Sequence, residues 1–92
     1  FISLGKIMGL EKLILRNNLI KKLHIEFPLS LKNLKDLNLQ NNFISLIAKN
    51  AFINLINLQI LNLYGNNIKE IDFNEIFVSN HRLQTLYINH LE

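Results

Sequence analysis

Cysteine is absent from the chain, and proline and glycine are scarce, with one proline and three glycines among 92 residues. Without cysteine no disulfide bond can form, and cysteine usage gives no indication of the redox compartment. A hydrophobic content of 49% with so little proline and glycine excludes an intrinsically disordered chain. The sequence therefore encodes a folded segment.

Long hydrophobic runs are also missing. The longest stretch without a charged residue covers positions 50 to 68, and amide side chains interrupt it throughout. These are Asn54, Asn57, Gln59, Asn62, Asn66 and Asn67. We therefore expect no transmembrane span. The chain starts at Phe1 and shows no signal-peptide pattern, so we expect it to be an internal piece of a longer protein.

Catalytic motifs are missing as well. The serines and histidines form no recognisable catalytic pattern, and there is neither a glycine-rich phosphate loop nor an H-E-x-x-H spacing. Glu70, Asp72 and Glu75 are grouped, but a calcium loop needs closer, alternating oxygen ligands. His81 and His90 lack a third ligand at a suitable spacing. We expect no enzymatic activity, no metal site and no cofactor.

What the sequence does contain is a repeat. Positions 34 to 47 follow the pattern L-x-x-L-x-L-x-x-N-x-I-x-x-I, and the same six positions recur 24 residues earlier and 24 residues later. The three sets are Leu10, Leu13, Leu15, Asn18, Ile20 and Leu23, then Leu34, Leu37, Leu39, Asn42, Ile44 and Ile47, then Leu58, Leu61, Leu63, Asn66, Ile68 and Ile71. A fixed period of this length indicates a solenoid of stacked coils.

This wording resembles the leucine-rich repeat family, in particular its 24-residue class, which is common in extracellular and receptor proteins such as Toll-like receptors and insect adhesion and immunity proteins. The resemblance covers almost the whole chain, as a partial unit at 1–9, repeats at 10–33, 34–57 and 58–82, and an incomplete last unit at 83–92. In that last unit Leu91 takes the place of the asparagine. Because end coils expose apolar residues meant for a neighbour, adjoining repeats or caps are expected.

The resemblance implies an α/β solenoid with a parallel β-sheet on the concave face and irregular or 3₁₀ structure on the convex side. Strands are predicted at 12–16, 36–40, 60–64 and 85–89, because the alternation of a pleated strand points the repeated leucines inward. Phe27, Phe52 and Phe73 are expected to fill the coils from within.

The repeated asparagines Asn18, Asn42 and Asn66 follow the strands, where backbone groups lose their ladder partners. An amide side chain both donates and accepts there, so the three are expected to form a structural ladder. Asparagines outside this position, such as Asn33, Asn54 and Asn80, are expected in surface turns.

The outward strand residues are the candidate ligand-binding surface, because members of the family bind protein ligands on the concave wall. The candidate residues are Arg16, Asn38, Gln40, Asn62, Tyr64, Tyr87 and Asn89. Tyr64 is the best single anchor, and Gly65 beside it is expected to leave room for a partner. Charges on this surface are close to balance, so nucleic-acid binding is not expected.

Three functions are compatible with the resemblance. The first is a protein-binding module of an extracellular or cell-surface protein that acts in recognition, adhesion or innate immunity. The second is a cytoplasmic scaffold that docks a signalling protein, and the third is an adaptor that selects substrates for an attached enzymatic domain. Flanking sequence would separate them, and the identity of the ligand stays open.

Overall fold

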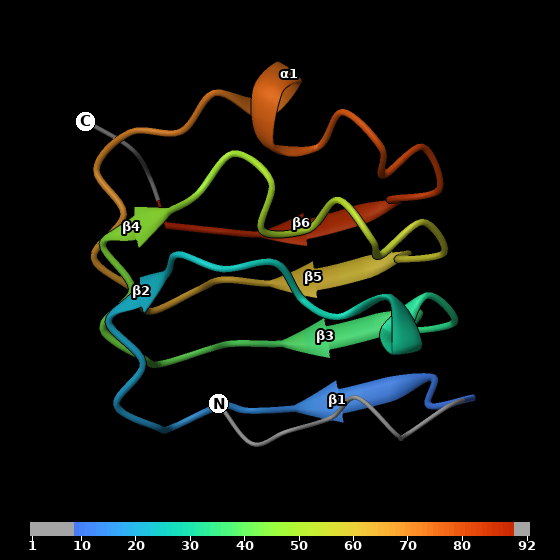
Figure 1. The fold of residues 1–92 in the computed structure, drawn as a ribbon. Helices are drawn as coiled ribbons and strands as arrows, with labels where there is room; N and C mark the ends of the chain where they lie inside the picture. The colour runs from blue at the N-terminus through green and yellow to red at the C-terminus, as the bar shows by residue number, and fades with distance from the viewer. Residues whose placement is uncertain (1–8, 90–92) are drawn as a thin grey trace.

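A four-stranded parallel sheet dominates the computed structural model, which describes residues 9–89. The strands are β1 (Lys12–Ile14), β3 (Asp36–Asn38), β5 (Ile60–Asn62) and β6 (Thr85–Tyr87), in the spatial order β1-β3-β5-β6 (Figure 1). Lys12 pairs with Asp36, Asp36 with Ile60, and Ile60 with Thr85. Each sequence unit, which we call a coil, therefore contributes one strand, and the expected parallel sheet of stacked coils is confirmed. The partial first unit and Leu91 lie outside the described residues.

All four strands begin at the predicted residue, but each ends two residues earlier than predicted. The backbone amides that follow the strands explain the difference. The Gln40 amide donates to Oδ1 of Asn38 (3.0 Å), and the Tyr64 amide donates to Oδ1 of Asn62 (3.0 Å). These two amides bond to side chains of their own coil, so the regular ladder stops there.

The repeated leucines form the core of the stack. They are fully buried in the second and third coils, at Leu34, Leu37, Leu39, Leu58, Leu61 and Leu63. Each coil buries apolar surface against its neighbours, as expected for stacked repeats. The pattern of inward leucines was therefore predicted correctly from the sequence.

A column of phenylalanines fills the side of the coils opposite the sheet. Phe27 stacks on Phe52 with ring centroids 6.0 Å apart, and Phe52 stacks on Phe77 at 5.7 Å. The prediction that Phe73 completes this column is wrong, because Phe73 is 45% exposed. A short helix, α1 (Phe73–Ile76), occupies the third coil at this point, and it moves the inward position four residues along to Phe77.

The return side of the coils contains little regular structure. The first coil has a 3₁₀ turn, η1 (Leu29–Leu31), which agrees with the expected 3₁₀ structure. Helix α1 was not predicted, and Asp72 caps it by accepting hydrogen bonds from the backbone amides of Asn74 (3.1 Å) and Glu75 (3.2 Å). Within residues 9–89, no helix has the length and apolar character needed to cross a bilayer.

Asn80 is buried, which contradicts its predicted place in a surface turn. Its Nδ2 donates to the carbonyls of Phe52 (3.0 Å) and Leu55 (2.9 Å) of the preceding coil. The alignment of the coils explains the burial, because Asn80 lies three residues after Phe77 as Leu55 lies three residues after Phe52. An asparagine thus takes an inward position that holds leucine one coil earlier. Asn33 and Asn54 do lie in turns.

A second, smaller sheet was not predicted. β2 (Lys22–Leu23) pairs in parallel with β4 (Leu46–Ile47), so the first two coils are joined by strands at two places (Figure 1). The pairing follows the 24-residue period, with Lys22 beside Leu46 and Leu23 beside Ile47.

Candidate functional site

A buried asparagine holds the turn at the end of β3. Nδ2 of Asn42 donates to the carbonyl of Leu39 in its own coil (3.0 Å) and to that of Leu15 in the preceding coil (3.1 Å). Its Oδ1 accepts from the backbone amide of Ile20 (3.2 Å). The side chain is only 4% exposed, so it supplies partners to backbone groups that water cannot reach.

Asn66 repeats this arrangement one coil later, and Asn18 repeats only part of it. Nδ2 of Asn66 donates to the carbonyls of Leu63 (2.9 Å) and Leu39 (3.0 Å), and its Oδ1 accepts from the amide of Ile44 (3.0 Å). Asn18 is exposed and bonds to the carbonyls of its own turn. Asn42 and Asn66 therefore tie adjacent coils together, whereas Asn18 stabilises its own turn.

The outward side chains of the main sheet and of the residues just beyond it form what we call the sheet face. Inward positions such as Leu37 and Leu61 are fully buried, while the residues on either side are partly or well exposed. The sheet face consists of three rows, namely Lys12, Asp36, Ile60 and Thr85, then Ile14, Asn38, Asn62 and Tyr87, then Arg16, Gln40, Tyr64 and Asn89. All seven candidate ligand-binding residues thus lie on one surface.

The amide residues of the sheet face are engaged inside the chain. Oδ1 of Asn38 and Oδ1 of Asn62 each accept from the backbone amide two residues later. Nδ2 of Asn62 also donates to Oε1 of Gln40 in the neighbouring coil (3.3 Å). These side chains have lost part of their capacity to bind a partner, and their positions are fixed by the bonds that they make.

Asn89 is engaged in the same way. Its Oδ1 accepts from the backbone amides of Gly65 (2.6 Å) and Asn66 (3.2 Å), which belong to the preceding coil. The interaction links the last coil to the third at the edge of the sheet face. Sequence reasoning assigned Asn89 a place on the binding surface and did not foresee this internal bond.

The two tyrosines differ from the amides. Tyr64 is 52% exposed and Tyr87 is 53% exposed, and neither hydroxyl bonds to another of the described residues. Tyr87 pairs with Asn62 across β5 and β6, so Tyr64, two residues beyond Asn62, lies diagonally from it. Ile60 on the same strand is partly exposed as well. The sequence analysis placed Ile60 in this row but did not choose it as a binding residue.

Charge divides the sheet face into two halves. Over β1 and β3, Lys12 lies 3.9 Å from Asp36 and Lys35 lies 3.4 Å from Glu11, so charges of both signs face solvent. Exposed pairs of this kind contribute little to stability. Arg16 forms no ion pair with any described residue. The half over β5 and β6 carries no charged residue in the three rows, and both tyrosines lie on it.

Gly65 is required by the neighbouring coil, and the expectation that it leaves room for a partner is wrong. Its φ angle is +77°, and a Cβ built on it would overlap Oδ1 of Asn41. The equivalent residues of the earlier coils, Asn17 and Asn41, also have positive φ angles, of 60° and 56°. Glycine and asparagine tolerate this conformation better than other residues. The space above Gly65 is thus filled from within the chain.

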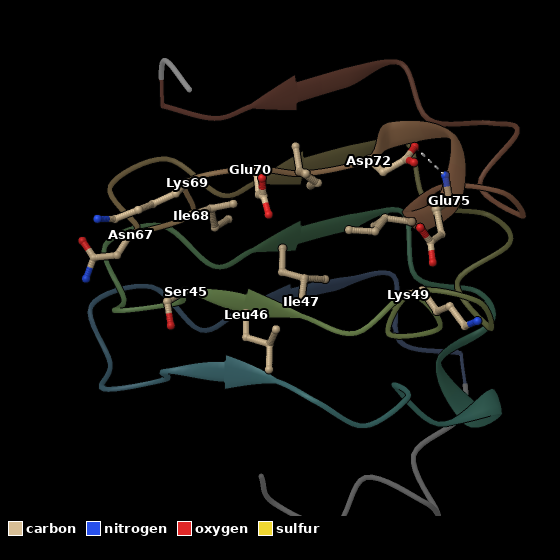
Figure 2. Close-up of a pocket in the computed structure, with 12 residues that line it drawn as sticks. Ser45, Leu46, Ile47, Lys49, Asn67, Ile68, Lys69, Glu70, Asp72 and Glu75 are labelled. Atoms are coloured by element: carbon tan, nitrogen blue, oxygen red, sulfur yellow. Dashed lines mark hydrogen bonds between the residues drawn. The ribbon is translucent and has the colours of Figure 1, made fainter. Parts of the chain in front are cut away.

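A hollow on the other side of the stack was not predicted from the sequence. It lies between β4 and residues 67–76 and is lined by apolar and charged side chains (Figure 2). The signal that could have indicated it is the length of the third unit, which takes 25 residues to reach Leu83 instead of 24.

Metal-binding clusters were searched for in the same part of the chain. Within residues 9–89, no three His, Asp or Glu side chains come close enough to hold a metal ion. Glu70, Asp72 and Glu75, which the sequence groups together, form no such cluster, and Asp72 caps α1.

Comparison with known proteins supplies the family. Residues 8–68, more than half of the chain, match the family model described as "Leucine rich repeat". No curated protein matches the chain significantly. Domains of this kind are generally protein-binding and non-enzymatic. Together with the repeat, the parallel sheet and the inward leucines, the match shows that this chain belongs to the leucine-rich repeat family.

Proposed function

We propose that this chain is the protein-binding module of an extracellular or cell-surface protein that acts in recognition, adhesion or innate immunity. Its partner docks on the sheet face, over β5 and β6. Membership of a generally protein-binding family supports binding of a protein, and the resemblance to the 24-residue class supports the extracellular location.

The observation that carries the binding site is the exposure of Tyr64 and Tyr87 on adjacent strands. Tyrosine is enriched among residues that dominate interface energies, because it covers a large apolar area and keeps a polar end. Both hydroxyls lack an internal partner among the described residues, so a ligand can bond to them without breaking an existing bond.

The surroundings of the tyrosines favour a rigid docking surface. Asn62 is held through Tyr64's backbone amide and Gln40, and Asn89 is held through Gly65. Because little ordering is needed when a partner arrives, the entropic cost of binding is reduced. The absence of charge in these rows leaves the tyrosines and Ile60 as an uncharged centre, while Lys12, Asp36 and Arg16 lie on the other half of the face.

The proposal is tested by screening the chain against two arrays, one of secreted and cell-surface ectodomains and one of cytoplasmic signalling domains. We expect a partner among the ectodomains, and we expect Tyr64→Ala to weaken it by about 2 kcal/mol. Phe43→Ala is the matched control, because Phe43 is similarly exposed (49%) but lies outside the sheet face.

A partner that is lost with Phe43→Ala and kept with Tyr64→Ala would move the binding site away from the sheet face. A partner found only among the cytoplasmic domains would overturn the extracellular assignment and favour a cytoplasmic scaffold. Melting temperatures of both variants establish that any loss of binding does not come from unfolding.

A further inference from the structure

A strand edge is open inside the stack, between the second and third coils. Between the first two coils, the Ser45 amide donates to the carbonyl of Lys21 (2.9 Å), and the Ala48 amide donates to that of Leu23 (2.7 Å). These bonds flank the pairing of β2 with β4. The side of β4 that faces the third coil has no paired strand.

The bonds that would close this edge are missing. The residues equivalent to Ser45 and Ala48 one coil later are Lys69 and Asp72, and neither donates a backbone hydrogen bond to β4. The last backbone bond between the two coils on this side runs from the Asn67 amide to the Ile44 carbonyl (2.9 Å). The carbonyls of Ser45 and Ile47 consequently receive no donor from the third coil.

Helix α1 explains why the third coil leaves the path of its predecessors. Asp72, which stands where the next ladder bond would form, caps the helix with its side chain. The chain then turns into α1, and Ile76 of the helix becomes buried. The divergence is thus part of the packed structure, because the cap and the buried Ile76 both hold it in place.

The divergence creates a hollow of about 950 Å³, within the range of about 300 to 1,000 Å³ that ligand sites occupy. Ile68 and Ile76 are buried at its base, and Ile47 is partly buried beside them. Leu46 on β4 remains half exposed at the rim. Figure 2 shows β4 on one side and the segment from Asn67 to Asp72 on the other.

The charged residues around the hollow favour a basic ligand. Glu70, Asp72 and Glu75 line it together with Lys49 and Lys69, so carboxylates outnumber ammonium groups. None of the five forms an ion pair with a described residue. The carboxylates of Glu70 and Glu75 are exposed and bond to no other side chain in the described part of the chain. They are free to pair with cations of a partner.

We propose that this hollow binds an extended, basic peptide segment of another protein, which adds as a strand to the open edge of β4. Its backbone amides donate to the carbonyls of Ser45 and Ile47, its apolar side chains contact Ile47 and Ile68, and its basic side chains approach Glu70 and Glu75. Strand addition of this kind takes affinity from main-chain hydrogen bonds and specificity from alternate side chains. The surface is separate from the sheet face, so the inference does not depend on the proposed function.

The probe is a short synthetic peptide that alternates valine and lysine. A second peptide carries N-methyl groups on alternate residues, which removes the amide donors of one edge and keeps the charge. We expect the first peptide to shift the backbone resonances of residues 45–48 and 68–72, and the N-methylated peptide to bind about tenfold more weakly or less. A peptide that alternates valine and glutamate should not bind.

Two variants locate the site. Glu70→Lys combined with Glu75→Lys should weaken the valine–lysine peptide about tenfold or more, since it reverses the charge beside the hollow. Glu11→Lys reverses an exposed acid near the sheet face and should leave the affinity unchanged, as should Tyr64→Ala. Retention of affinity by Tyr64→Ala separates this site from the one under "Proposed function".

Three results would overturn the inference. One is equal affinity of the N-methylated and unmethylated peptides, which would show that no strand is added. Another is resonance shifts confined to the sheet face, which would place the peptide elsewhere. The third is self-association that sedimentation detects and that the Glu70→Lys, Glu75→Lys variant abolishes, which would make a second copy of this chain the occupant.

Discussion

The interior coils and the end coils carry the same apolar pattern but bury it to different degrees. The repeated leucines of the second and third coils are fully buried, at Leu34, Leu37, Leu39, Leu58, Leu61 and Leu63. Their counterparts in the first and last coils are only partly buried, at Leu10, Leu13, Leu15, Leu83, Leu86 and Ile88. Burial of a repeat position is therefore set by the coils on either side of it, because a solenoid has no central core.

The polar positions show the same contrast. Asn42 is buried and bonds to two coils, whereas Asn18 is exposed and bonds within its own turn. The same residue type in the same position of the repeat therefore has a different energetic weight. Pairs of equivalent substitutions in interior and end coils can measure that weight directly.

The largest expected difference is between Leu61→Ala and Leu13→Ala. Leu61 on β5 is fully buried, so its truncation should cost about 3 to 4 kcal/mol, including the cavity that remains. Leu13 on β1 is partly exposed and should cost about half as much. Denaturant unfolding of both variants gives the two values. Equal losses would show that the first coil is covered as fully as the third.

Asn42→Ala and Asn18→Ala should differ next. Removal of the Asn42 side chain leaves buried backbone groups of two coils without partners, at a cost of about 2 kcal/mol. The groups bonded to Asn18 can turn to water, so its loss should cost less than about 1 kcal/mol. The measurement is the free energy of unfolding in urea. A larger loss for Asn18→Ala would contradict the role of the asparagines as links between coils.

Gly65→Ala should cost more than Gly9→Ala, although both glycines have φ angles near +80°. Each alanine is strained by about 1 to 2 kcal/mol in this conformation. Only the alanine at position 65 also meets a neighbour, Asn41, while nothing lies within 4 Å of a Cβ at position 9. Thermal melts would rank the two. Adding Asn41→Gly to Gly65→Ala should restore part of the stability, and a strictly additive double variant would argue against the contact.

The smallest effects are expected at Tyr64 and Tyr87. Their side chains point away from the stack and are about equally exposed, so each alanine variant should change the free energy of unfolding by no more than about 0.5 kcal/mol. Here the interior coil and the end coil should behave alike. A loss at Tyr64 alone, seen in the same urea titrations, would show that the difference between coils also extends to outward residues.

The repeat was sufficient to predict the parallel sheet, the first residue of every strand and the inward leucines, because all of them follow from one period and one alternation. It failed where the third coil departs from that period. Phe73 and Asn80 were misplaced because counting in steps of 24 carries no information on where an extra residue is accommodated. Short-range hydrogen bonds to Asp72, which form α1, decided that point.

The candidate site was predictable as a surface but not in its details. The strand pattern places Arg16, Tyr64 and Tyr87 outward, and the structure agrees. Whether an outward amide is free depends on the residue one coil away, as Asn89 and Gly65 show, and no pattern within one repeat contains that information. The open edge of β4 was equally hidden, since it results from bonds that do not form.

The open edge also has a mechanical consequence. The first and second coils are joined by two sets of paired strands, whereas the second and third are joined at β3 and β5 and on the return side, where Asn80 bonds to Phe52 and Leu55. A tensile load along the stack meets fewer parallel fasteners at the second junction. Under stretching, that junction should yield first and act as the compliant joint of an otherwise stiff rod.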